Sequence, residues 1–487
     1  MMIEFSDADR RAPYHFLCGC QSELVARASG RLTDRISRRD ILKGIAASIA
    51  TSSLGFSAEA FSRPEDRPVV LTGARIFDGR KNVLIEGRDV LVSGKNIVDL
   101  VPARQAPEGA HVIDCAHKVV MPGMIDAHWH SIFAAVPPEM ALSPNLDVNY
   151  IYMLAAQEAE RTLMRGFTTV RDVGGPSFAL KRIIDENRLP GPRIYPSGAM
   201  ISQTSGHGDF RNPRAVSNPA LCSLSAAEVA GASAIADGVP EVLRKTREQL
   251  MLGASQIKIM AGGGVTSLFD PLDSLQYTPA EMRAAVDAAS DWGTYVCAHV
   301  YSPAGIQRAL SCGITSIEHG QLADEETVKR IVDAGAWWSI QPFLIDEDAN
   351  PQRTEEQRTM QRIIAEGTIR SFELGQKHKA KMAWGTDILF NPAGTVTQGK
   401  KLAKIASWFD KADVLRFGTS RNAELLALSG PRNPYPGKLG VVEAGALADL
   451  LVVDGNPLEN ISLLENPDRH FQVIMKDGRI YKNTLTT

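Results

Sequence analysis

Two patterns of apolar and polar positions divide this chain of 487 residues. Near both ends, over residues 66–121 and 437–487, apolar and polar residues alternate along short segments that glycine-containing turns interrupt. Alternation with a period of two is typical of half-buried β-strands, so these segments predict a small β-sandwich built from both termini. Over residues 122–436, continuous apolar runs alternate with longer stretches in which apolar residues recur every three to four positions. This second pattern predicts buried strands that alternate with helices.

The central region contains a series of eight apolar runs. The first is VVMPGMIDA at 119–127, and the others lie at 167–175, 193–201, 255–263, 294–300, 314–320, 337–343 and 382–389. Amphipathic helical patterns separate them, at 240–254, 279–292 and 325–336 among other places. Eight strands, each followed by helical or loop sequence, predict an α/β fold in which 122–436 forms a (β/α)8 barrel of the TIM type.

Composition and charge limit the classes of partner. A hydrophobic content of 44% and a charged content of 22% are ordinary for a globular protein. The formal net charge is −3 and no basic stripe stands out, so we expect no nucleic-acid partner. The cysteines form no paired zinc-knuckle pattern. Four of them lie mostly in apolar runs and are expected to be buried free thiols: Cys115, Cys222, Cys297 and Cys312.

The N-terminal 60 residues have the pattern of a targeting signal. Adjacent Arg38 and Arg39 precede a moderately apolar stretch, 41–56, and Ala58-Glu59-Ala60 offers a cleavage site. The pattern resembles a twin-arginine export signal, although a chance arginine pair before a helix is the alternative. We expect a periplasmic or secreted protein, and no membrane association after signal removal because no later segment is apolar enough to span a bilayer.

The first apolar run ends in a pair of histidines. His128 and His130 are two residues apart, so on a strand their side chains point to the same face. Two imidazoles directed into one space suit a transition-metal site. A pair of packed core histidines fits the same two residues equally well.

Four further residues with metal-binding or ionisable side chains belong to later strand candidates. Lys258 lies in the run at 255–263, and His299, His319 and Asp387 lie at or near the ends of later runs. Each has a structural alternative: an ion-paired lysine, an ordinary strand-end histidine, or a turn aspartate. However, the strand ends of such a barrel carry the chemistry, and four of only ten histidines fall on them. Their joint occurrence in this order predicts a metal site.

These residues resemble the amidohydrolase superfamily, specifically its binuclear-metal branch, as does GKLGVVEAGALADLLVVD after the barrel. The resemblance implies that His128, His130 and Asp387 bind one divalent ion and that His299 and His319 bind a second. It also implies a carbamate on Lys258 that bridges both ions. An unmodified lysine is cationic near neutral pH and would repel two cations, whereas a carbamate is an anion with two oxygens. Zinc is the default metal for such ligands.

The mechanism expected from this centre is amide hydrolysis. Two cations lower the pKa of a bridging water and supply hydroxide, while the second ion polarises the substrate carbonyl. Asp387 takes the proton from the water and passes it to the leaving nitrogen. We expect a small-molecule or dipeptide substrate, and a homo-oligomeric enzyme.

Two residues outside the ligand set are candidates for substrate contact. His207 lies in SGHGD, where Gly206 and Gly208 permit close approach, and Tyr301 follows His299 by two residues. An exposed loop histidine and a packed tyrosine are the alternatives. Both motifs resemble metal-dependent dipeptidases and carboxypeptidases that remove a C-terminal amino acid, a subgroup that includes ochratoxin A amidohydrolases. This resemblance favours cleavage of an amide between an acyl or aminoacyl group and an L-amino acid, with Tyr301 donating to the substrate carboxylate.

Other functions remain open at this point. A deaminase or cyclic-amide hydrolase, such as an imidazolonepropionase-like enzyme, belongs to the same superfamily, but these typically use one metal and lack the lysine on the fourth strand. A catalytically silent scaffold is a second alternative, although such relatives have usually lost metal ligands. Lactonase and organophosphate hydrolase activity are also compatible, because fold and metals alone do not select the scissile bond.

Overall fold

The computed structural model describes residues 67–143, 145–211, 224–266, 269–352 and 354–485. The predicted signal at 1–60 and Cys222 therefore lie outside the described residues. Cys115, Cys297 and Cys312 are free and buried, as predicted. In the described part of the chain, no helix is both long and apolar enough to cross a membrane.

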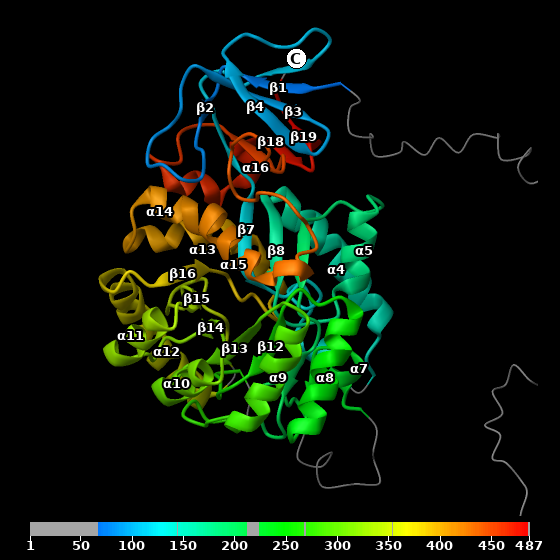
Figure 1. Cartoon of the computed structure of the whole chain (residues 1–487), viewed down its shortest axis with the longest axis vertical. Coiled ribbons are helices and arrows are strands. Elements are labelled where there is room, and N and C mark those ends of the chain that lie inside the picture. The colour runs from blue at the N-terminus through cyan, green and yellow to red at the C-terminus, as the bar shows by residue number, and fades with distance from the viewer. Residues whose placement is uncertain (1–66, 144, 212–223, 267–268, 353, 486–487) are drawn as a thin grey trace, which may run out of the picture. The chain divides into compact units, whose positions relative to one another are not determined.

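Two parallel sheets carry the strands predicted for the central region (Figure 1). One sheet has the order β7-β8-β9, with β7 at Met124–Trp129, β8 at Phe167–Asp172 and β9 at Arg193–Pro196. The other has the order β11-β10-β12-β13-β14-β15-β16. Its strands are β10 (Met200–Ser202), β11 (Ser233–Ile235), β12 (Ile257–Met260), β13 (Val296–Val300), β14 (Ser316–His319), β15 (Trp337–Ile340) and β16 (Lys381–Trp384).

All eight predicted runs thus contain a parallel strand, and the α/β class is confirmed. The third run holds two short strands, β9 and β10, because the chain turns at Gly198, which has φ of 76°. The sequence pattern did not predict β11. The last strand, β16, contacts the first, β7, and the backbone amide of Asp387 donates to the carbonyl of His128 over 2.8 Å. Closure of both sheets into one barrel stays a prediction.

Helices follow most of these strands, and Figure 1 shows α8 to α11 on the outer side of β12 to β15. The helix α9 begins where Thr278 and Glu281 form a reciprocal capping box, as a Thr-x-x-Glu pattern predicts. The α-helices are α3 (Pro138–Ala141), α4 (Val148–Met164), α5 (Phe178–Asp185), α7 (Ala226–Val229), α8 (Val239–Leu252), α9 (Pro279–Asp291), α10 (Pro303–Ser311), α11 (Glu325–Asp333), α12 (Glu355–Lys377), α13 (Gln398–Lys404), α14 (Lys411–Arg416), α15 (Asn422–Leu426) and α16 (Pro467–His470). Shorter helical turns are η2 (Pro392–Thr397), η3 (Ile405–Ser407), η4 (Phe417–Arg421), η5 (Ala427–Arg432) and η6 (Ile461–Glu465).

Two further sheets contain the strands from the ends of the described chain. The four-stranded sheet has the order β4-β3-β1-β5, from β1 (Val69–Thr72), β3 (Arg88–Ser93), β4 (Asn96–Pro102) and β5 (His111–Asp114). The five-stranded sheet has the order β19-β18-β17-β6-β2, from β2 (Arg75–Ile76), β6 (Val119–Pro122), β17 (Leu450–Val453), β18 (Phe471–Lys476) and β19 (Arg479–Asn483). One apolar cluster includes residues of both sheets, such as Val92, Val120 and Val452.

The pairing of β6 with β17 links the two ends of the chain. These strands are antiparallel, with Met121 opposite Leu451, so the five-stranded sheet combines segments more than 300 residues apart in sequence. After β6, only Gly123 separates this sheet from β7. The side chain of Thr168 leaves no room for a Cβ at Gly123, since the nearest atom would be 2.2 Å away. The strand that carries the histidine pair is therefore anchored directly to the terminal sheets.

Candidate metal centre

His128, His130 and Asp387 form a cluster that could hold a metal ion. The Oδ1 atom of Asp387 lies 3.3 Å from Nε2 of His128 and 3.1 Å from Nε2 of His130. Burial by itself raises the pKa of Asp387, but His128 and the hydrogen bonds from both histidines lower it well below the usual range. Asp387 has a φ of 52°, a conformation that few non-glycine residues adopt and that is held here beside the end of β7.

Hydrogen bonds on the far side of each imidazole orient this pair. Nδ1 of His128 donates to Oε2 of Glu318 over 2.8 Å, and Nδ1 of His130 donates to the carbonyl of Gly174 over 3.0 Å. A metal ion would replace the contacts between each Nε2 and the carboxylate of Asp387, because Nδ1 keeps its proton and Nε2 then offers a lone pair to the ion. Two lone pairs and a carboxylate that converge on one point suit a divalent cation, so this donor set fits a metal ion.

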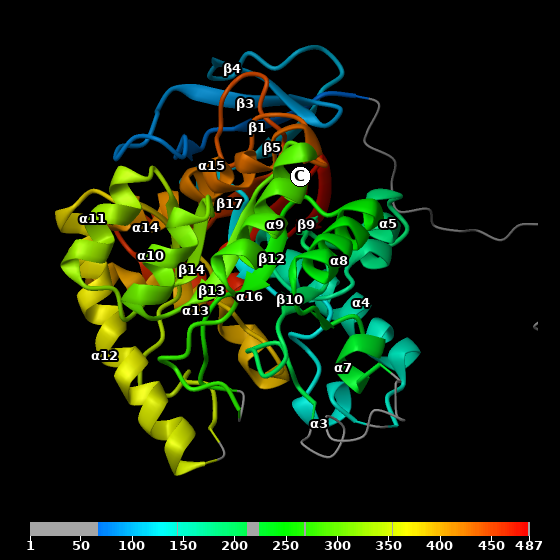
Figure 2. The same ribbon diagram turned by 60° about the horizontal axis from the view of Figure 1, so that its bottom comes forward.

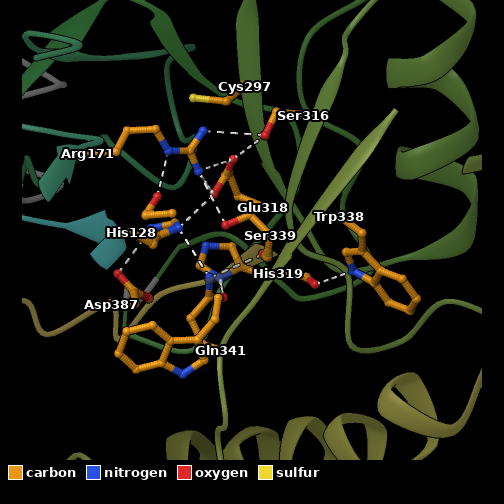
Figure 3. A network of polar contacts seen from close by, with 12 residues as sticks. His128, Arg171, Cys297, Ser316, Glu318, His319, Trp338, Ser339, Gln341 and Asp387 are labelled. Carbon is orange, nitrogen blue, oxygen red and sulfur yellow. Dashed lines mark hydrogen bonds and ion pairs between the residues drawn. The ribbon is translucent and has the colours of Figure 1, made fainter. Parts of the chain in front are cut away.

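A buried ion pair supports His128 from behind (Figure 3). Arg171 on β8 donates from Nη2 to both carboxylate oxygens of Glu318, over 2.8 and 2.7 Å, and both side chains are fully buried. Burial by itself raises the pKa of Glu318, but Arg171 and His128 lower it well below the usual range, so the carboxylate stays ionised. The sequence interpretation missed both residues. The available signal was a charged residue in the interior of each of two strands, β8 and β14.

The rings of His299 and His319 lie beside the first cluster. The ring centroids of His299 and His319 are 4.5 Å apart, and those of His128 and His319 are 4.9 Å apart. Nδ1 of His319 donates to Oε1 of Gln341 over 2.6 Å, and Nε2 of His299 donates to the carbonyl of Gly263 over 3.1 Å. Burial lowers the pKa of both imidazoles well below the usual value, so both are neutral and keep one lone pair for a ligand.

Lys258 completes the predicted ligand set on β12. Its side chain is 1% exposed, and it lines the same cavity as the histidines. Among the described residues, no carboxylate lies within ion-pair distance of its Nζ atom. Burial lowers the pKa of this amine. A buried amine with no paired anion is a good precursor for an anionic carbamate, which would match a site for two cations.

His207 and Tyr301 lie against the second pair of histidines. The ring of His207 stacks on that of His299 with centroids 4.0 Å apart, and its Nδ1 donates to Oδ2 of Asp270 over 2.8 Å. The ring of Tyr301 stacks on that of His319 at 5.1 Å. Burial raises the pKa of Tyr301 well above its usual value, so its hydroxyl remains a hydrogen-bond donor. Asp270 was not predicted, because an aspartate between strand candidates carries no distinguishing pattern.

A cavity of about 830 Å³ unites these residues. All eight predicted site residues line it, so the structure brings together every side chain singled out from the sequence. Its other lining residues come largely from segments between the strands and from helices, including α3 and α12, which lie on either side of these segments in Figure 2. The volume suits a drug-sized molecule.

Comparison with known proteins agrees with this geometry. The model of the amidohydrolase family matches residues 119–482. Ochratoxinase from Aspergillus niger is 29% identical over 388 residues, which cover 75% of this chain and 76% of that protein. A solved prolidase complexed with N-methylphosphonate-L-proline is 33% identical with a TM-score of 0.78, covering 86% of this chain and all of that chain.

A solved Xaa-Pro dipeptidase with methionine bound in its active site is 28% identical, with a TM-score of 0.74, and the alignment covers 85% of this chain and 100% of that chain. The alignments with the two solved structures cover the whole of those chains. The family match spans well over half of the chain, from β6 to β19. The chain therefore belongs to the amidohydrolase family and is a hydrolase that acts on amide bonds.

Proposed function

We propose that this enzyme uses two metal ions to cleave the amide between an acyl or aminoacyl group and a C-terminal L-amino acid. The observation that carries the proposal is the convergence of His128, His130 and Asp387 in a cavity that His299, His319 and Lys258 also line. The relatives support the substrate class, since they include an ochratoxinase, a prolidase and an Xaa-Pro dipeptidase. Ochratoxin A resembles an N-acyl-phenylalanine and is a candidate substrate.

The ligand assignment follows the two groups of side chains. His128, His130 and Asp387 would hold one ion, and His299 and His319 would hold the other. Lys258 would bridge them after its neutral amine forms an N–C bond to carbon dioxide and loses one proton, which yields an anionic carbamate. Two bound divalent ions, zinc by preference of this donor set, would acidify a water molecule and polarise the scissile carbonyl.

The protein groups around the ions supply proton transfer and orientation. Asp387 accepts a proton from the attacking water at a carboxylate oxygen and delivers it to the leaving nitrogen, and its low pKa keeps the carboxylate ionised before the reaction. The Tyr301 hydroxyl donates to the substrate carboxylate. His207 is oriented by its hydrogen bond to Asp270 and stacks on the ring of His299, and it makes a further contact with the substrate.

The remaining architectural and cellular expectations are proposals as well. The two parallel sheets would form one (β/α)8 barrel over 122–436, and the terminal sheets at 66–121 and 437–487 would form a β-sandwich. The 1–60 segment would direct export through the twin-arginine route to the periplasm or beyond. We expect the mature enzyme to be a homo-oligomer.

A substrate screen tests the proposed function. Zinc-reconstituted protein is incubated with N-acyl amino acids, dipeptides and ochratoxin A, and released amino acid is quantified. We expect hydrolysis of members with an L-amino acid at the carboxyl end and none with the chelated protein. Turnover confined to purines, cyclic amides, lactones or phosphotriesters would refute this assignment.

A further inference from the structure

Four cationic side chains line the cavity: Arg211, Lys258, Lys401 and Lys404. Arg211 pairs with Asp209, from Nε over 2.7 Å and from Nη2 over 2.6 Å. Lys404 pairs with Asp346 over 2.6 Å and with Asp348 over 2.8 Å. The charges of Arg211 and Lys404 are therefore already compensated by the protein. Lys258 belongs to the metal centre, which leaves Lys401.

Lys401, on α13, is buried without an anionic partner. It is 5% exposed, and its Nζ donates to the backbone carbonyl of Asp348 over 3.3 Å. Among the described residues, no carboxylate lies within ion-pair distance of this Nζ. The nearby carboxylate of Asp348 is engaged by Lys400 over 3.0 Å and by Lys404 over 2.8 Å. An ammonium with one long hydrogen bond retains two donor positions for a ligand.

The electrostatic surroundings of Lys401 make an anionic ligand favourable. Burial, followed by the positive charge of Lys404, lowers the pKa of Lys401, which indicates that its cationic form is poorly solvated. Asp387 also interacts with it, so the amine lies within electrostatic reach of the reacting centre. Asp348 and Asp346 also favour the cation, but from beyond ion-pair distance, so a ligand carboxylate in direct contact would stabilise it further.

Apolar side chains form much of the remaining cavity wall, which also contains Glu139 and several amide side chains, while Asp209, Asp346 and Asp348 pair with Arg211 or with lysines of α13. It contains aromatic and aliphatic side chains from several segments, namely Phe210, Phe269, Phe343, Leu344, Leu389 and Phe390. A ligand with an apolar or aromatic body and one negatively charged end matches this combination. A wall with one uncompensated cation does not favour a dication or a polyanion.

We propose that Lys401 binds the free carboxylate of the substrate and so restricts the enzyme to acyl amino acids and peptides with an uncapped carboxyl end. This inference rests on the proposed function and deepens it. A carboxylate accepts several hydrogen bonds, so Lys401 supplies the opposite charge while Tyr301 supplies a neutral donor.

Binding of a matched acid and amide tests the role of Lys401. N-acetyl-L-phenylalanine and N-acetyl-L-phenylalaninamide are titrated by calorimetry into the zinc-loaded full chain carrying Asp387→Asn, so that neither ligand is consumed. Adding Lys401→Met should weaken binding of the acid about 10- to 100-fold and leave the amide unchanged. Lys401→Gln, which keeps a polar group, should give the same selective loss, and Lys401→Arg should restore part of the affinity.

Lys400→Met is the control, because it removes a positive charge from the same helix and lies outside the cavity lining. It should retain the preference for the acid. A preference that survives both Lys401→Met and Lys401→Gln, or that Lys400→Met removes equally, would overturn the assignment. Turnover of the acid by the chain with intact Asp387 reports on the proposed function separately. If the acid is not hydrolysed but is still bound more tightly than the amide in a Lys401-dependent way, the proposed function is refuted and the role of Lys401 in carboxylate binding is supported.

Discussion

The floor and the wall of the cavity are built in different ways. The floor consists of His128, His130, His319 and Asp387, which lie at or just after strand ends and are braced by buried partners such as Glu318. The wall residues His207 and Lys401 lie on a segment between strands and on α13, and Asp270 accepts a hydrogen bond from His207. Figure 3 shows the side chains behind His128, where Arg171 contacts Glu318 and Glu318 contacts the imidazole.

This difference suggests a division of roles. Each floor histidine has a second buried partner that orients its ring, so the rings are positioned before any metal ion or substrate binds. Lys401, by contrast, has one protein hydrogen bond and, among the described residues, no carboxylate within ion-pair distance. We expect floor variants to change metal content, catalysis or stability, and wall variants to change substrate selection.

The largest effect on catalysis is expected from Asp387→Asn. The amide cannot accept the proton of the attacking water, so kcat should fall about 1,000-fold while the metals stay bound. Steady-state kinetics and metal analysis of the same preparation measure both quantities. Glu139→Gln, which alters another cavity-lining carboxyl group, serves as the control. Near-normal turnover in Asp387→Asn would refute its role in proton transfer.

The largest effect on stability is expected from Glu318→Gln. This change leaves the guanidinium of Arg171 buried without its counter-ion, which should lower the free energy of unfolding by about 3–5 kcal/mol. It also weakens the bond that orients His128, so metal affinity should fall about 10- to 100-fold. Chemical denaturation and competitive chelation measure the two effects. Glu326→Gln breaks the exposed pair with Arg330 and should leave stability and metal affinity near the wild-type values.

Two separate glycine-to-alanine substitutions, at Gly385 and Gly264, each add one methyl group, the first beside the floor and the second beside the wall. A Cβ at Gly385 would lie 2.4 Å from the backbone nitrogen of His128, whereas a Cβ at Gly264 would lie 1.9 Å from Cε1 of His207. Gly385→Ala must displace backbone, so it should cost about 1–3 kcal/mol of stability and reduce metal content. Gly264→Ala should lower kcat/KM with metal content unchanged. Equal metal loss in both variants would remove the distinction between floor and wall.

The smallest effect is expected from Tyr301→Phe. A lost neutral hydrogen bond is worth about 0.5–1.5 kcal/mol, so KM for free-carboxylate substrates should rise by roughly 2- to 13-fold. KM for the corresponding esters should change less. The ratio of the two KM values measures the contact directly, and an equal rise for acids and esters would argue against it.

The same contrast explains which parts of the molecule could be predicted from sequence. The strands were predictable because their apolar runs are continuous, and the floor was predictable because histidines are rare and mark the ends of those runs. The Arg171–Glu318 pair was not, since its partners are 147 residues apart and neither position reveals the other.

Lys401 illustrates a second limit. It lies in QGKKLAK beside Lys400 and Lys404, and nothing in this segment indicates which lysine is buried. In the structure Lys401 is 5% exposed, whereas the side chain of Lys400 is 32% exposed and paired with Glu347. The third predicted strand was divided for a similar reason, because the turn at Gly198 depends on packing as well as on sequence. Which lysine is buried and where a strand ends depend on contacts between segments that are distant in the sequence.

The number of metal ions per chain tests the binuclear centre most directly. Inductively coupled plasma mass spectrometry on purified full-length protein, with the chain quantified by amino-acid analysis, should give two divalent ions per chain. Lys258→Ala should lower that number. A native content of one ion would contradict the binuclear assignment and favour a deaminase-like site, and a native content of zero would favour a silent scaffold.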